Sequence, residues 1–160
     1  MPISPGIFKI RINRSSELYL DADAGKNGEI VTLNRIGSRV SDNKWEVLPV
    51  QIAGPIVSSE WFTIRNVKFA NYFLDADFTD TGNNNCKVQL WKRWTLPVVG
   101  NPFGTNQIWK IDKLHGSTFR VSNGADDKMK LSVRNRVPDE HVKLHRISAS
   151  RTQAWVFERV

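Results

Sequence analysis

Residues 6–11, Gly-Ile-Phe-Lys-Ile-Arg, decide the fold, because close variants return at 60–65 (Glu-Trp-Phe-Thr-Ile-Arg) and at 117–122 (Ser-Thr-Phe-Arg-Val-Ser). Apolar residues stand two apart in each copy, which is the spacing of a half-buried strand. Three landmarks follow every copy in one order: a leucine, a Val-x-Leu pair and a tryptophan. They are Leu20, Leu74 and Leu131; Val31/Leu33, Val88/Leu90 and Val142/Leu144; and Trp45, Trp109 and Trp155.

The repeat step is close to a third of the 160-residue chain, at 54 residues from Phe8 to Phe62 and 57 from Phe62 to Phe119. Turn-forming Gly, Asn, Asp and Pro separate the landmarks, and no stretch has a helical period. Twelve short strands indicate a sandwich or barrel, and a threefold repeat favours a barrel because three equivalent units can close with few free edges. We therefore predict an all-β chain with the β-trefoil fold. It would form one domain over 1–160, with pseudo-symmetric four-strand repeats at about 6–50, 60–115 and 117–160.

The predicted core consists of equivalent residues from the three repeats. Burying one such side chain stabilises a protein by about 1.5 to 3 kcal/mol. The expected layers are Phe8, Phe62 and Phe119; Ile10, Ile64 and Val121; Leu20, Leu74 and Leu131; Leu33, Leu90 and Leu144; and the three tryptophans.

Composition and charge narrow the function classes. The apolar runs are too short to span a membrane, so no membrane insertion is expected. The single cysteine, Cys86, and the absence of a secretory-type start favour a cytoplasmic location. A net charge of +7 attracts anionic partners without specifying any of them.

The closing strands resemble a known family. Asn43-Lys44-Trp45, Gln107-Ile108-Trp109 and Gln153-Ala154-Trp155 are similar to the Gln-x-Trp repeats of ricin-B-type β-trefoil lectins. The stretches 4–8, 64–67 and 72–75 resemble the small single-domain trefoil proteins of mushrooms. The resemblance covers essentially the whole chain, and the family includes both lectins and protease inhibitors, so it implies the fold more strongly than the function.

The lectin branch implies one sugar site, in the second repeat. The family pattern matches Asp75, Trp91 and Asn106, with Gln107 beside Asn106 and Gly82 in the intervening loop. A carboxylate accepts two hydroxyl hydrogen bonds, an aromatic face packs on a pyranose ring, and an amide both donates and accepts. The resemblance therefore implies a lectin for galactose or N-acetylgalactosamine, with glycans or glycoproteins as partners. The alternative is that Asp75 and Asn106 only satisfy turn amides.

The other two repeats depart from this pattern. The first keeps Asp21 but has Asn34 and Asp42 in place of the aromatic and the amide. The third has Ser132, His145 and Thr152 at the equivalent positions. Both lack an aromatic platform, so we expect the third repeat not to bind sugar and the first to be a poor second candidate.

Two further hypotheses remain open. One is a protease inhibitor that presents a rigid surface loop, either Lys26 or Asn27 in 25–28 or the insertion 94–105, to a serine, cysteine or aspartic protease. The other is a sulfated glycan bound through the basic surface, which predicts heparin affinity that falls in moderate salt.

No motif points to catalysis or to a bound cofactor. His115, His141 and His145 lack zinc-ligand spacing, and no phosphate loop or nucleophile elbow is present. We therefore expect no enzyme activity, metal, cofactor or nucleic-acid partner, and a monomer or homodimer.

Overall fold

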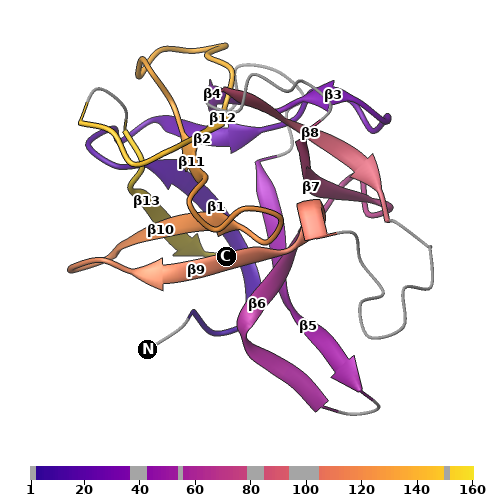
Figure 1. Cartoon of the computed structure of the whole chain (residues 1–160). Coiled ribbons are helices and arrows are strands. Elements are labelled where there is room, and N and C mark those ends of the chain that lie inside the picture. The colour runs from indigo at the N-terminus through magenta and orange to yellow at the C-terminus, as the bar shows by residue number, and fades with distance from the viewer. Residues whose placement is uncertain (1–2, 37–42, 54–55, 79–84, 94–104, 150–151) are drawn as a thin grey trace.

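The chain folds into antiparallel strands, joined by turns and one short 3-10 helix (Figure 1). The computed structural model describes residues 3–36, 43–53, 56–78, 85–93, 105–149 and 152–160. The first repeat contains β1 (Gly6–Ile12), β2 (Leu18–Asp21), β3 (Glu29–Ile30), β4 (Thr32–Arg35) and β5 (Lys44–Ala53). The second contains β6 (Ile56–Asn66), β7 (Tyr72–Asp77), β8 (Cys86–Lys92), the 3-10 helix η1 (Thr105–Gln107) and β9 (Trp109–Lys113). The third contains β10 (Thr118–Asn123), β11 (Lys130–Ser132), β12 (Lys143–His145) and β13 (Trp155–Arg159).

The first and last strands of the three repeats close into a six-stranded barrel. Pairing runs from β1 to β5, β6, β9, β10 and β13, and β13 pairs again with β1. A closed ring leaves no unpaired edge. Six of the remaining strands form three hairpins, β2–β4, β7–β8 and β11–β12, which gather at one end of the barrel (Figure 1), and β3 pairs with β8. The prediction of an all-β trefoil is confirmed.

One hydrogen bond recurs in each repeat and links its hairpin to the barrel. The indole Nε1 of the closing tryptophan donates to the backbone oxygen of the leucine on the second strand. The pairs are Trp45 with Leu20 at 2.9 Å, Trp109 with Leu74 at 3.0 Å and Trp155 with Leu131 at 2.9 Å. All three indoles are fully buried. Each tryptophan also lies opposite the opening phenylalanine, in the pairs Phe8–Trp45, Phe62–Trp109 and Phe119–Trp155.

The predicted core is buried with one exception, Phe119, which is only half-buried and packs at the rim of the core. The third repeat has Phe157 where the other two have Val47 and Ile111. The Phe119 and Phe157 rings meet edge to face with centroids 5.4 Å apart. The larger Phe157 thus shares the barrel rim with Phe119, which is why neither ring is fully enclosed.

The third strand of the first repeat, predicted around Val31 and Leu33, forms as β4, and a further short strand, β3, precedes it. The two are separated at Val31 because the chain changes partners there: β3 pairs with β8, whereas β4 pairs with β2. Val31 itself is fully buried, and its backbone N–H donates to the oxygen of Val88. The first repeat is thereby attached directly to the second.

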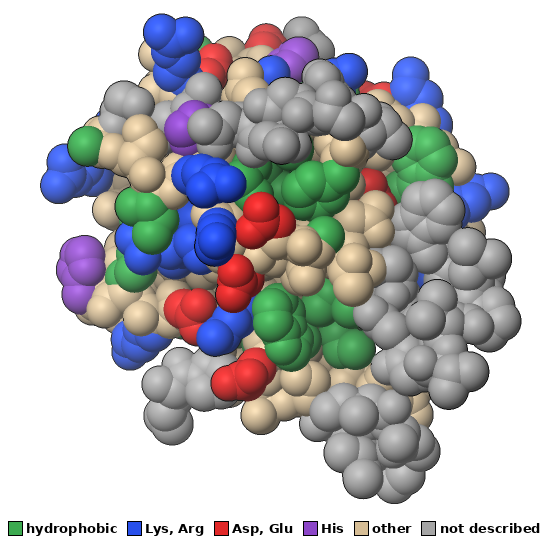
Figure 2. Space-filling model, viewed as in Figure 1, with side chains coloured by type: hydrophobic (Ala, Val, Ile, Leu, Met, Phe, Trp, Pro, Cys, Tyr) green, Lys and Arg blue, Asp and Glu red, His purple; other side chains and the backbone are tan. Residues whose placement is uncertain are grey.

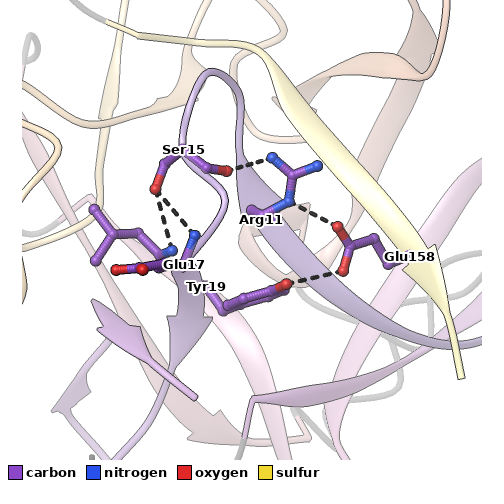
Figure 3. A network of polar contacts seen from close by, with 6 residues as sticks. Arg11, Ser15, Glu17, Tyr19 and Glu158 are labelled. Carbon is purple, nitrogen blue, oxygen red and sulfur yellow. Dashed lines mark hydrogen bonds and ion pairs between the residues drawn. The ribbon is translucent and has the colours of Figure 1, made fainter.

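A polar network on the outside of the barrel joins β1, β2 and β13 (Figure 3). The Glu158 carboxylate accepts hydrogen bonds from Arg11 Nε at 2.7 Å and from the Tyr19 hydroxyl at 3.0 Å. Burial acts to raise the pKa of Glu158, but the hydrogen bonds from Arg11 and Tyr19 outweigh it, so the pKa lies below its ordinary value of 4.5. Burial, followed by the bond to Glu158, raises the pKa of Tyr19.

The recurring indole hydrogen bond predicts a specific loss of stability. Trp109→Phe keeps a buried aromatic ring but removes the N–H that Leu74 accepts, so the free energy of unfolding should fall by about 1 to 3 kcal/mol. Urea unfolding of the variant and of Trp61→Phe, a half-buried tryptophan on β6, gives the comparison. Equal losses in the two variants would contradict the assignment.

The Glu158 network predicts a pH-dependent contribution to stability. Because the pKa of Glu158 is lower in the folded state, its contribution is present above the unfolded pKa of about 4.5 and is lost as the pH falls through the folded value. Glu158→Gln should therefore unfold at lower urea than the parent at neutral pH, and the difference should shrink in acid. Glu60→Gln, at an exposed position on β6, is the control. A difference that does not change with pH would rule out the linkage.

Candidate functional site

A cavity of about 760 Å³ lies between the second and third repeats. Its lining combines apolar, aromatic and charged side chains. The second repeat contributes Asp75, Ala76, Asp77, Phe78, Gln89, Trp91, Thr105 and Asn106, and the third contributes Ala125, Asp126, Met129 and Arg146. Three of the predicted sugar-site residues, Asp75, Trp91 and Asn106, therefore share one cavity.

Asp75 is positioned by the β7–β8 hairpin, in which it lies directly opposite Gln89. Gln89 Nε2 donates to one carboxylate oxygen at 3.1 Å, and Asn106 Nδ2 donates to the other at 3.0 Å. The residue is only 1% exposed. Two amide donors thus hold the carboxylate in one orientation.

Asn106 lies within η1 and is held partly through its own backbone. Its backbone oxygen accepts a hydrogen bond from Asn123 Nδ2 at 3.0 Å. The adjacent Gln107 is fully buried, does not line the cavity, and donates from Nε2 to the oxygen of Lys92 at 3.0 Å. Gln107 therefore ties η1, which contains Asn106, to the end of β8.

The aromatic part of the cavity comes from Trp91 on β8 and Phe78 just after β7, and both side chains are half-buried. Trp91 follows Gln89 by two residues, so the two side chains lie on the same face of the strand. Gly28 of the first repeat lies beside the Trp91 ring, and a Cβ atom added at this glycine would be 4.0 Å from Trp91 Cζ3. The first repeat thus packs against Trp91 from outside the cavity.

The third repeat supplies one basic and one acidic side chain to the lining. Arg146 follows β12, and Gln153 Nε2 holds its backbone oxygen at 2.8 Å. Asp126 lies in the connection between β10 and β11, where its Oδ1 accepts from the backbone N–H of Lys128 at 3.0 Å. With Asp75 and Asp77, the lining contains three carboxylates and one guanidinium.

Several lining residues were not predicted from the sequence, including Phe78, Gln89, Asp126 and Arg146. Gln89 could have been predicted from the sequence, because it lies between Val88 and Leu90 on the strand that pairs with the strand of Asp75. Asp126 and Arg146 could not have been predicted, since their position at the cavity depends on how the third repeat packs against the second.

The equivalent positions of the other repeats are arranged differently. Asp21 is buried like Asp75, but Asn34 at the aromatic position donates to Asp139 Oδ1 at 3.4 Å. In the third repeat Ser132 donates to the backbone oxygen of Lys143. Asp42, Gly82 and the insertion 94–104 lie outside the described residues.

The proposed inhibitory loop is attached to β8. Asn27 Oδ1 accepts a hydrogen bond from the backbone N–H of Lys92 at 2.8 Å, and the N–H of Gly28 donates to Leu90 O at 2.9 Å. The Lys26 side chain is 70% exposed, and its Nζ lies 3.4 Å from Glu29 Oε2. The Asn27 side chain therefore anchors the loop to β8, and both Lys26 and Asn27 are exposed, so the inhibitory loop stays a prediction.

Within the described segments, no group of three or more His, Cys, Asp or Glu residues is placed to hold a metal ion. None of the helices in the same segments is long and apolar enough to cross a membrane.

The Asp75 geometry predicts that an amide cannot replace the carboxylate. In Asp75→Asn the new NH₂ group would face either Gln89 Nε2 or Asn106 Nδ2, both of which are donors, so one buried hydrogen bond is lost. The free energy of unfolding should fall by about 1 to 3 kcal/mol. Chemical denaturation of this variant beside Asp127→Asn, at an exposed position, measures the difference. If Asp75→Asn is as stable as the parent, the hydrogen bonds of the two amides do not depend on the charge of Asp75.

No family model and no curated protein matches this chain. Solved structures do resemble it. A mosquitocidal holotoxin superimposes with a TM-score of 0.79 at 16% identity over 99% of this chain and 18% of its own. The designed three-fold symmetric protein ThreeFoil gives 0.75 at 16% identity over 97% and 99% of the two chains. The Polyporus squamosus lectin bound to the human-type influenza-binding epitope Neu5Acα2-6Galβ1-4GlcNAc gives 0.70 at 15% identity, over 98% of this chain and 50% of the lectin. The chain thus spans about a fifth of the holotoxin and half of the lectin, and at these identities the likeness shows a shared β-trefoil fold.

Proposed function

We propose that this protein is a carbohydrate-binding lectin whose sugar site is the cavity of the second repeat. One observation carries the proposal: the cavity joins an oriented carboxylate, Asp75, with an aromatic wall and an amide, Asn106. A lectin from Polyporus squamosus has the same fold, which supports the proposal without locating a site.

The proposed recognition divides between polar and apolar groups of the sugar. The Asp75 carboxylate, which Gln89 and Asn106 orient, would accept hydroxyl hydrogen bonds from the sugar. Trp91 would pack its face against the C–H side of the pyranose ring, since an aromatic surface there removes apolar area from water. Because Gln89 and Asn106 fix the carboxylate beforehand, little ordering entropy is lost on binding.

We propose galactose or N-acetylgalactosamine as the bound sugar and glycans or glycoproteins as the partners. The proposal is for binding without chemistry. Gly82, which the family resemblance adds to the site, remains part of the prediction from sequence.

Removing the aromatic wall tests the assignment. Trp91→Ala should weaken galactose and N-acetylgalactosamine binding about tenfold or more, because the apolar contact is lost while the polar groups remain. Trp91→Phe should recover part of the affinity. Isothermal titration with each sugar measures the change, and Trp61→Ala, a half-buried tryptophan outside the cavity, should bind as the parent does.

A glycan array and a panel of trypsin, papain and pepsin separate this proposal from the inhibitor hypothesis. We expect glycan binding and no inhibition at micromolar protein. Inhibition of a protease in the absence of glycan binding would contradict the lectin proposal. Glycan binding that is unchanged in Trp91→Ala would contradict the choice of cavity.

A further inference from the structure

Cationic side chains from three strands gather on the outer face of the barrel. Lys110 lies on β9, Arg120 on β10 and Lys130 on β11. Figure 2 shows Lys and Arg side chains grouped beside acidic ones over this part of the molecule. None of the three residues lines the cavity of the second repeat.

The strand register brings the three cations around one serine. Ser122 lies opposite Lys110 on one side and opposite Lys130 on the other. Residues directly opposite on paired strands share a face, and so do residues two apart on one strand, so Arg120 faces the same way as Ser122. Ser122 is buried, and its Oγ accepts a hydrogen bond from Lys130 Nζ at 2.8 Å.

Arg120 is the least satisfied member of this group. Its Nε is buried and has no hydrogen-bond partner within the described residues. None of the ion pairs found in those segments involves its guanidinium, although Asp112 is its cross-strand neighbour. Instead, Asp112 Oδ1 lies 3.8 Å from Lys110 Nζ. A half-buried guanidinium with an unpaired donor is costly unless an acceptor is supplied.

The cations are close enough to repel one another. Burial lowers the pKa of Lys130 most, and the charges of Arg120 and Lys110 lower it further. The carboxylates of Asp127 and Asp112 act in the opposite direction without restoring the ordinary value. Three cations against two carboxylates leave one net positive charge on the face.

We propose that Lys110, Arg120 and Lys130 form a binding site for the sulfate group of a sulfated glycan. A sulfate ester carries one negative charge and several acceptor oxygens, which match the net charge of the face and the unpaired Arg120 donor. A phosphate ester carries about two charges and would meet more repulsion from Asp112 and Asp127.

The position of the face favours a glycan as the carrier of the sulfate. The β10–β11 connection forms one wall of the cavity through Asp126 and Met129, and the next residue after Met129 is Lys130. An oligosaccharide with one unit in the cavity could therefore continue toward the cationic face. This choice of carrier rests on the proposed function, whereas the anion site itself does not.

Titration with a heparin-derived tetrasaccharide at constant ionic strength tests the proposal. Arg120→Gln should weaken binding about tenfold or more, and Lys110→Gln should also weaken it, because each removes a charged donor. Lys44→Gln, at an exposed lysine on β5, removes the same charge elsewhere and should change the affinity less than about twofold. In parallel, the NMR signal of Arg120 Nε–H should shift as sodium sulfate replaces chloride, and native spectra of the variants confirm their folding.

The outcomes separate the two proposals. Suppose that Arg120→Gln loses tetrasaccharide binding, and that neither the parent nor any variant binds galactose. The anion site is then supported, and the assignment of the cavity as a sugar site is contradicted. Equal losses in Arg120→Gln and Lys44→Gln would show attraction by net charge alone and overturn the site. A response of Arg120 to inorganic sulfate without binding of the tetrasaccharide would overturn the sulfated glycan as its ligand.

Discussion

The structure depends on a buried donor that has a single acceptor in each repeat. A tryptophan indole excluded from water must place its N–H against an oxygen, because an unmatched donor in the interior is destabilising. In Trp45, Trp109 and Trp155 that oxygen belongs to the leucine of the second strand. The bond therefore joins the barrel to the hairpins three times, with the same pair of residue types and distances of 2.9 to 3.0 Å.

The cavity is a consequence of this arrangement. Gln107 lies two residues before Trp109, and its side chain holds the end of β8; Gln153, two residues before Trp155, holds Arg146 in the same way. The glutamines that precede the tryptophans thus set the ends of the third strands. Asn106 and Arg146 line the cavity beside these two glutamines, so part of its polar lining is positioned by the residues that close the fold.

Much of the fold could be predicted from the sequence because its information is local and repeated. The spacing from Ile10 to Leu20 and its two counterparts identifies equivalent strands, and equivalence alone indicates closure around a threefold axis. The additional strand β3 could not be predicted, because it forms by pairing with β8 in another repeat. The candidate site could likewise be predicted only in part. Asp75 and Asn106 follow from the family pattern, whereas the roles of Arg146 and Arg120 depend on contacts with residues distant in sequence.

Closure of the barrel between β1 and β13 has a consequence for the order of folding. Phe8 to Ile12 pair with Trp155 to Arg159, so the ring joins segments separated by almost the whole chain. Contacts of such high sequence separation form late, because the entropy of bringing the ends together must be overcome first. During synthesis at the ribosome, β1 must therefore wait for β13, and until then it is paired on one side only.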